Sequence, residues 1–278
     1  SPARKREIID RCITLNIHAL TITPVNEWVD GSAKSGNLRE VNIEDLLSRD
    51  AIMLKNKNVA SYLRGKTILV TGAAGSIGSE ICKQVARANP GFLIMLDKAE
   101  SPLHEQEIRL ESEFQDLGLQ TVLADVTDKE NLEHIMKTYR PEVIFHAAAY
   151  KHVPMMERYP IQAVRCNVFG TKTVADLAVK YGVEKFVLVS TDKAVNPTNV
   201  MGASKRIAEM YIQSLDKKLR GSANGGTRFI TTRFGNVLGS NGSVIPLFKE
   251  QIKKGGPLTV TDAKVTRYFM TIPEALSP

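Results

Sequence analysis

Three polar side chains of different chemistry stand next to each other in the middle of the chain. Thr191, Asp192 and Lys193 come one residue after residues 186–189, which are apolar and mostly β-branched or aromatic. That composition predicts a strand. Ligands of an open parallel sheet bind in the crevice beyond the carboxyl ends of its strands. A hydroxyl, a carboxylate and an amine at such a position are therefore placed for hydrogen bonding and proton transfer.

A helix is predicted immediately after this trio, because Thr198 or Asn199 can cap one after Pro197. Met201 and Lys205 are four residues apart in it and should share one face. The strand end and this helix face therefore have to be held beside each other by the rest of the fold.

A glycine-rich turn earlier in the chain indicates what else binds there. It follows a short buried strand at residues 67–70 and runs directly into a helix. Glycine at such a turn permits tight bending and close approach of the backbone to a pyrophosphate, and the helix N-terminus adds amide donors. Strand, turn and helix together predict a dinucleotide site made by Gly72, Gly75, Ser76, Ile77 and Gly78.

Asp97 ends the next apolar run, about 20 residues after the last glycine. An acid at this point can hold the adenosine ribose hydroxyls and repel a 2′-phosphate, which favours NAD over NADP. Lys98 follows directly. A solvated loop lysine is the simpler interpretation of Lys98, and a partner for a 2′-phosphate is the alternative.

These stretches resemble the extended short-chain dehydrogenase/reductases, in which a Ser/Thr, a Tyr and a Lys four residues beyond the Tyr surround a nicotinamide. Met201 occupies the Tyr position here, and Thr191-Asp192-Lys193 replaces the Thr-Asp-Glu of the sugar-nucleotide 4,6-dehydratases. Both replacements resemble the membrane-associated bacterial UDP-N-acetylglucosamine 4,6-dehydratases of polysaccharide and glycan biosynthesis. The resemblance covers nearly the whole chain and is most specific over residues 72–267.

The resemblance implies a hydro-lyase that oxidises sugar C4, eliminates water across C5 and C6, and returns the hydride to C6. We expect Asp192 to be the acid for the C6 hydroxyl, with a raised pKa, and Lys193 to be the base at C5. Lys205 would hold the nicotinamide ribose and Thr191 the C4 oxygen. Met201 cannot accept a proton, so an inactive NAD or sugar-nucleotide binding module is one alternative. A UDP-sugar 4-epimerase is the other, although it depends on the missing Tyr.

Further cofactor contacts are implied near the ends of two other strands. Asp125 and Val126 would meet the adenine, with a helix cap for the segment from residue 127 as the other interpretation of Asp125. Ala147 and Ala148 would let the backbone pass close to the nicotinamide ribose.

The substrate contacts are expected on both sides of the active strand. Lys151 and His152 could face the sugar nucleotide, and the resemblance implies Asn236 and Arg267 on its diphosphate. A surface ion pair is the alternative for Arg267. Asn167 should lie within one long helix over residues 161–180, where Asn is a poor interior residue. The resemblance implies that it stabilises the active-site strand, and a local bend of the helix is the alternative.

The composition is that of an ordinary globular chain of 278 residues with a net charge of +7. Three cysteines far apart fit a reducing compartment, and no spacing indicates a metal site. The charge favours an anionic partner, which we take to be a UDP-sugar, because no aromatic-basic or recognition-helix signature indicates nucleic acid.

We predict an α/β fold with a Rossmann-type doubly wound parallel sheet. Residues 1–64 would be an arm from a missing membrane anchor, 65–235 the NAD-binding domain with the active site, and 236–278 a small substrate-binding portion. No apolar run is long enough to span a bilayer, so these residues are expected to be soluble. The whole protein is expected at the cytoplasmic face of the bacterial inner membrane, as a homo-oligomer built on the helices near residues 161–180 and 199–219, whose faces could equally be ordinary core.

Overall fold

The structure is a computed structural model that describes residues 57–220, 226–240, 244–260 and 269–275, and isolated parts of residues 4–40. The chain divides into two compact units, Ser1–Met53 and Leu54–Pro278. In the first unit, β1 (Leu20–Ile22) pairs antiparallel with β2 (Leu38–Glu40). The predicted domain boundaries after residues 64 and 235 stay predictions.

The second unit is built on a six-stranded sheet in which every neighbouring pair of strands is parallel. In spatial order its strands are β5 (Leu119–Leu123), β4 (Phe92–Asp97), β3 (Thr67–Thr71), β6 (Val143–His146), β7 (Lys185–Thr191) and β8 (Arg228–Phe234). Of these six strands, β3 comes first in the chain, and it lies between the second, β4, and the fourth, β6. This is the Rossmann order. This confirms the predicted fold class.

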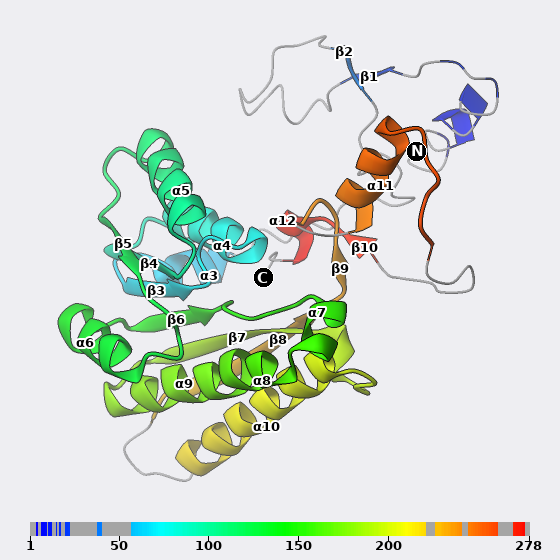
Figure 1. Ribbon diagram of the computed structural model, residues 1–278. Helices are drawn as coiled ribbons and strands as arrows, with labels where there is room; N and C mark the ends of the chain where they lie inside the picture. The colour runs from blue at the N-terminus through cyan, green and yellow to red at the C-terminus, as the bar shows by residue number, and fades with distance from the viewer. Residues whose placement is uncertain are drawn as a thin grey trace. The chain divides into compact units, whose positions relative to one another are not determined.

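Helices cover both faces of this sheet (Figure 1). On one side lie α4 (Ser76–Arg87) and α5 (Glu100–Glu113). On the other lie α6 (Lys129–Tyr139), α9 (Thr171–Lys180) and α10 (Val200–Arg220). The crossover helices bury the central strands β3 and β4 on both faces, and this explains why these strands are almost continuously apolar.

Alternation along each strand divides the interior into two cores. Ile68 and Val70 of β3 pack with α4 and α5, whereas Leu69 between them packs with α6 and α9. Successive side chains of a strand point to opposite faces, so β3, β4 and β6 each contribute to both cores. The carboxyl ends of the strands are thereby held in fixed positions at one edge of the sheet.

The shorter elements mostly lie near this edge or in the C-terminal part. They are α3 (Lys57–Leu63), α7 (Val153–Arg158), α8 (Pro160–Ala163), the π-helix η2 (Val164–Gly170), the 3₁₀-helix η3 (Asp192–Ala194), β9 (Asn236–Val237), α11 (Val244–Lys253), β10 (Phe269–Met270) and α12 (Ile272–Ala275). β9 and β10 pair in parallel. No helix in the described ranges combines the length and the apolarity needed to cross a bilayer.

Candidate active site

The turn between β3 and α4 requires glycine at two positions. Gly72 has a φ of +71°, and a Cβ there would lie 2.5 Å from the backbone nitrogen of Ala148. A Cβ at Gly78 would lie 2.0 Å from the carbonyl oxygen of Gly72, whereas one at Gly75 would lie 3.3 Å from the same oxygen. The backbone is thus packed closely where α4 begins at Ser76, and a helix N-terminus of this kind accommodates phosphate.

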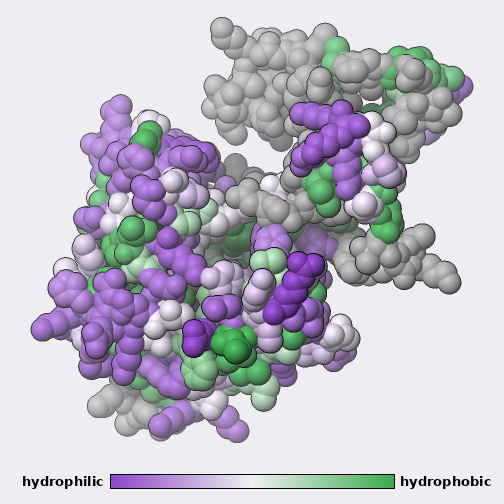
Figure 2. All heavy atoms as spheres, in the orientation of Figure 1, coloured by the Kyte–Doolittle hydropathy of each residue, from purple (hydrophilic) through white to green (hydrophobic). Residues whose placement is uncertain are grey.

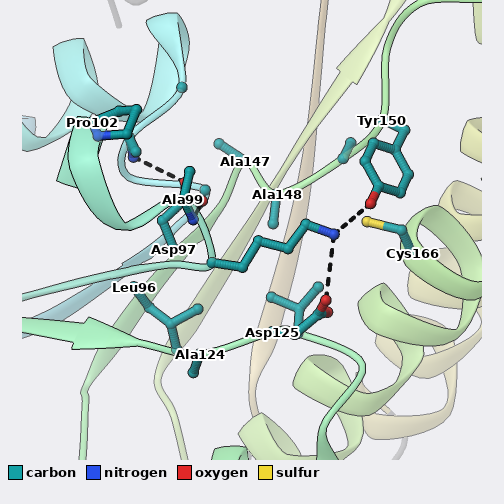
Figure 3. Close-up of a pocket in the computed structure, with 16 residues that line it drawn as sticks. Leu96, Asp97, Ala99, Pro102, Ala124, Asp125, Ala147, Ala148, Tyr150 and Cys166 are labelled. Atoms are coloured by element: carbon teal, nitrogen blue, oxygen red, sulfur yellow. Dashed lines mark hydrogen bonds and ion pairs between the residues drawn. The ribbon is translucent and has the colours of Figure 1, made fainter.

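A cavity of about 270 Å³ opens beside this turn (Figure 3). It lies at the carboxyl ends of β3, β4, β5 and β6, where strand order reverses and ligands of doubly wound sheets bind. Seven of the predicted cofactor residues line it: Gly72, Gly75, Asp97, Asp125, Val126, Ala147 and Ala148. Three others, Ser76, Ile77 and Gly78, belong to the first turn of α4 and do not line it.

Asp97 is held rigidly at the end of β4. Its Oδ2 accepts a hydrogen bond of 3.0 Å from the Ala74 amide, and its Oδ1 accepts one of 3.0 Å from the Ala99 amide. A carboxylate oxygen has a second lone pair, so both oxygens can still accept from a ligand in the cavity. The carboxylate is therefore preorganised for ribose hydroxyls.

Lys98 is exposed after β4, as expected for a solvated loop lysine, but its ammonium has two partners. Its Nζ lies 3.3 Å from Oδ2 of Asp125, donates a hydrogen bond to the hydroxyl of Tyr150, and is 4.5 Å from the centre of the Tyr150 ring. Figure 3 shows these interactions at the wall of the cavity, where they connect the segments that follow β4, β5 and β6. Its ammonium is thus already neutralised by a carboxylate, which weakens its candidacy as a partner for a 2′-phosphate.

Asp125 also makes a local turn, but it does not cap α6. Its Oδ1 accepts hydrogen bonds of 2.9 Å from the amide and the hydroxyl of Thr127. The N-cap of α6 is Asp128, whose side chain accepts from the amide of Asn131. Burial alone would raise the pKa of Asp125, but the bonds from Thr127 and the charge of Lys98 outweigh it and hold the pKa below its ordinary value.

The polar trio after β7 forms one hydrogen-bonded cluster. The hydroxyl of Thr191 donates to Oδ1 of Asp192 at 2.9 Å. Nζ of Lys193 donates to the same Oδ1 at 3.1 Å and to Oδ1 of Asn236 at 3.1 Å. Lys193 thereby links the end of β7 to the first residue of β9. Two residues predicted for different tasks, Lys193 and Asn236, are brought into contact.

The raised pKa expected for Asp192 is wrong for this state. Burial pushes the pKa upward, but hydrogen bonds from Thr191 and Lys193 and the charge of Lys193 outweigh it, so the pKa is lowered. Charged donors beside a half-exposed carboxylate stabilise its ionised form. The ionised form of Asp192 is therefore favoured in this cluster.

Asn199 caps α10, as predicted, by accepting a hydrogen bond of 2.8 Å from the Gly202 amide. Met201 and Lys205 both lie on the buried face of this helix, each 4% exposed. Met201 packs into an apolar cluster with Met156 and Ala163. Met201 therefore contributes to packing, and its thioether does not supply the proton acceptor that a tyrosine would provide at this position.

The ammonium of Lys205 has no hydrogen bond or ion pair with any described residue, although it is almost fully buried. Burial lowers the pKa of Lys205 to about 8, against opposing contributions from Cys166 and Glu209. A buried polar group without a partner is rare in proteins. Together with the glycine cradle, this orphaned donor fits a dinucleotide whose ribose would accept from it.

Asn167 lies in a π-helical turn rather than within one regular helix, and it does not bond to β7. Its Oδ1 accepts from the amide of Tyr150 at 2.8 Å, and its Nδ2 donates to the carbonyl of Tyr150 at 3.0 Å and to the hydroxyl of Ser204 at 2.9 Å. This corrects the prediction. Asn167 fixes the segment after β6 against α10, because the π-turn aims its side chain there.

The remaining substrate candidates are less closely defined. Lys151 and His152 are exposed on the segment between β6 and α7, with His152 at the N-cap position of α7. Asn236 is the group already described beside Lys193. Arg267 lies outside the described residues.

Sequence reasoning missed two groups at this edge of the sheet. Tyr150 was passed over because an isolated tyrosine in a loop carries no pattern. Glu209 was passed over as well, although an acid four residues after Lys205, on the inner face of a helix, is a usable signal. Within the described part of the chain, no group of three His, Cys, Asp or Glu side chains is arranged to hold a metal ion.

The strand order, the glycine cradle and the cluster after β7 define a Rossmann-fold protein of the short-chain dehydrogenase/reductase type. Residues 68–277 match the family described as "Polysaccharide biosynthesis protein". The chain is 48% identical over 265 residues to the probable polysaccharide biosynthesis protein EpsC of Bacillus subtilis, which covers 95% of this chain and 43% of EpsC. It therefore belongs to the polysaccharide biosynthesis protein family, as the sequence resemblance predicted.

Other relatives differ in the reactions for which they are named. The inverting UDP-N-acetylglucosamine 4,6-dehydratase of Campylobacter jejuni is 35% identical over 214 residues, covering 76% of this chain and 61% of that protein. UDP-glucose 4-epimerases of Rickettsia species are 34% identical. The chain spans about half the length of the first two curated relatives that it matches.

Solved structures share the fold. The X-ray structure of Pen from Bacillus thuringiensis aligns with a TM-score of 0.69 and 35% identity, covering 77% of this chain and 63% of that one. Several other structures with this fold were determined with NAD bound.

Proposed function

We propose that this chain carries the catalytic part of an NAD-dependent nucleotide-sugar 4,6-dehydratase. The proposed substrate is UDP-N-acetylglucosamine, and the product is the UDP-linked 4-keto-6-deoxy sugar for bacterial surface polysaccharide or glycan synthesis. One observation carries this proposal: Asp192, Lys193 and Asn236 form a single cluster at the end of β7. Such a cluster supplies an acid, a base and a substrate anchor, which elimination of water requires.

The cofactor proposed is NAD, which would accept a hydride from sugar C4 and return it to C6 within one turnover. The cavity lined by Asp97 fits its adenosine, because the Asp97 carboxylate is aimed by two backbone amides. Lys98 is occupied by Asp125 and Tyr150. NAD is therefore favoured over NADP, since the carboxylate would repel a 2′-phosphate and no free ammonium offsets it.

The lowered pKa of Asp192 suggests how one carboxylate serves twice. Asp192 first accepts the proton of the C4 hydroxyl, directly or through the hydroxyl of Thr191, as that carbon is oxidised. It then donates the same proton to the C6 hydroxyl, which leaves as water. This replaces the tyrosine that Met201 displaces, and it makes Asp192 the acid of the elimination as the resemblance implied.

Lys193 takes the proton from C5, which the new C4 ketone acidifies, exchanges its ammonium protons with solvent, and donates one of them to C5 when the hydride returns to C6. It has to be neutral for the first step. Asn236, bonded to Lys193, would anchor the diphosphate, and Lys205 would donate to the nicotinamide ribose.

The same fold also supports two alternatives. A 4-epimerase needs a group that removes and restores the C4 proton, but it does not need a base at C5, so Lys193 would have no task. A non-catalytic binding module would have no need for the Asp192–Lys193–Asn236 cluster. Dehydration uses every member of the cluster, and we therefore favour it.

The partners proposed are the UDP-sugar and a second copy of this chain. Side chains that would form the contact between copies are apolar and exposed on α8, η2 and α10: Ile161, Phe169, Ile207 and Met210. Figure 2 shows apolar surface over α8. The cytoplasmic face of the bacterial inner membrane is the proposed location, with attachment through a segment outside these 278 residues.

The test is incubation of the NAD-loaded chain with UDP-N-acetylglucosamine in deuterated water, followed by NMR. We expect a 4-keto-6-deoxy sugar with solvent deuterium at C5. An NAD-loaded chain that binds the sugar nucleotide and leaves it unchanged would overturn the dehydratase and favour the binding module. Conversion to the C4 epimer would favour the epimerase.

A further inference from the structure

A carboxylate that the proposed reaction does not use is buried behind the active-site cluster. Glu209 of α10 has an exposed fraction of 0%. Its Oε1 accepts hydrogen bonds from the Ser190 hydroxyl at 2.6 Å and from Nε of Arg233 at 2.8 Å. Its Oε2 accepts from Nη2 of Arg233 at 2.5 Å and from Nη1 of Arg206 at 3.2 Å. The carboxylate is therefore fully satisfied and held from three elements.

The donors come from positions that are paired across the sheet. Ser190 of β7 lies opposite Arg233 of β8 in the strand register, so both side chains point to the face that α10 covers. The next pair, Thr191 and Phe234, is the last one in this ladder. One carboxylate thus fastens the two strands to the helix one residue before both strands end.

The residues that act on the substrate begin immediately beyond this fastening. Thr191 follows Ser190, Asn236 comes three residues after Arg233, and Lys205 precedes Glu209 by about one helical turn. Lys193 and Asn236 meet at 3.1 Å across the gap between the two strand ends. Their separation depends on how β7 and β8 are held, because no further ladder bonds lie between these ends.

The geometry of the hydrogen bonds to Glu209 indicates that this side chain orients its partners and does not simply fill space. Arg233 binds the carboxylate through two nitrogens, a fork that fixes both distance and angle. Bonds from Arg233, Ser190 and Arg206 outweigh burial and hold the pKa of Glu209 below its ordinary value. An apolar side chain could fill the same volume but would not fix the two strand ends.

We propose that Glu209 is a positioning residue, which locks the carboxyl ends of β7 and β8 to α10 and so sets the geometry of Thr191 and Asn236. The proposal rests on the proposed function for its kinetic consequence. Glu209 touches neither the cavity beside Gly72 nor the cluster of Asp192 and Lys193. Its loss should therefore affect the chemical step far more than binding of NAD.

The test is the substitution Glu209→Gln, which keeps the shape and removes the charge. We expect kcat to fall about 10²-fold, because a small misplacement of reacting groups has a cost of that size, while the affinity for NAD stays within about twofold. The alkaline limb of the kcat–pH profile should move to lower pH, since the Glu209 charge supports the Lys205 ammonium.

The matched control is Glu184→Gln, at the opposite end of β7. It removes a carboxylate that accepts from Lys66 and Tyr62 and lies away from the active-site edge. We expect kcat to stay within about twofold of the wild type. Ser190→Ala is a milder variant, which removes one donor and should fold even if Glu209→Gln does not. Its kcat should fall about 10-fold.

Unchanged kcat in both Glu209→Gln and Ser190→Ala would overturn the proposal. So would a parallel fall of NAD affinity and kcat, which indicates general destabilisation. If the wild type does not convert the sugar nucleotide, the proposed function fails separately. Binding of UDP then decides: Glu209→Gln should weaken it about 10-fold through Asn236, Glu184→Gln should not, and equal affinity in all three proteins would overturn the positioning role.

Discussion

Asp192 accepts and then donates one proton in the proposed cycle, so its substitution should separate chemistry from binding. We expect Asp192→Asn to lower kcat about 10³-fold, because general acid–base catalysis contributes on this scale. NAD affinity should not change, since Asp192 does not line the cofactor cavity. Single-turnover kinetics with UDP-N-acetylglucosamine measure the first effect and isothermal titration with NAD the second.

The control for this substitution is Asp128→Asn, which exchanges the same groups at the N-cap of α6. Asparagine caps helices about as well as aspartate, so kcat and stability should stay near wild type. If Asp192→Asn turns over as fast as this control, Asp192 carries no proton in the reaction.

Lys205 should destabilise the NAD-free chain, because burial lowers its pKa from 10.5 to about 8. Below about pH 8 the folded state carries the full penalty of a buried ammonium, on the order of 3 kcal/mol. Between about pH 8 and 10.5 the unfolded chain binds more protons than the folded one, so stability rises with pH.

Lys205→Met removes this penalty while keeping a similar shape. We expect the variant to be more stable than wild type at about pH 7, with the advantage shrinking at about pH 9.5. Urea unfolding of the two NAD-free proteins at both pH values tests this. A variant that is less stable at neutral pH would show that the buried ammonium has a stabilising partner.

At the scale of elements, the turn from β3 into α4 depends on backbone contact that only glycine permits. Gly78→Ala would place a Cβ 2.0 Å from the carbonyl of Gly72. The resulting overpacking should cost about 1–3 kcal/mol and abolish NAD binding. Gly75→Ala is the comparison, because its Cβ would lie 3.3 Å from the same oxygen.

Thermal unfolding and fluorescence titration with NADH measure both effects. Gly75→Ala should keep most of the stability and a measurable affinity. Equal loss in the two variants would mean that flexibility of the turn, rather than close packing at Gly78, is what matters.

The main elements could be predicted because their signals are local. The run over residues 67–71, the glycines after it and Asp97 at the next strand end are enough to specify a dinucleotide site. The π-helical turn around Asn167 could not be predicted, because the spacing of the apolar residues does not reveal that one extra residue is inserted into the helix. Its hydrogen bonds to Tyr150 and Ser204 depend on tertiary packing.

The residues of the candidate site could be predicted from the sequence, but the direction of the Asp192 pKa shift and the partners of Lys98 could not. A raised pKa for Asp192 follows from the reaction alone, whereas the lowered pKa follows from Thr191 and Lys193 beside it. Lys98 was assigned to solvent because its partners, Asp125 and Tyr150, are 27 and 52 residues away in the chain. Long-range pairs of this kind have no signature in a single sequence.

At the scale of the whole molecule, the exposed apolar side chains of α8, η2 and α10 should be covered by a second copy. We expect Ile207→Glu combined with Met210→Glu to convert the oligomer to a monomer, because two charges would be buried in the contact. Ile108→Glu, at an equally exposed position on α5, is the control. Light scattering after size-exclusion chromatography gives the mass of each, and a wild type that is already monomeric contradicts the prediction.

The central claim is that a hydride leaves C4 and returns to C6 of the same sugar. The most direct measurement uses UDP-N-acetylglucosamine deuterated at C4, mixed with substrate that has ordinary hydrogen at C4 and a different isotope in the sugar ring. We predict deuterium at C6 of the product, only in molecules that began with it at C4. Deuterium that stays at C4 of an epimer, or that exchanges between molecules, would contradict the internal redox cycle.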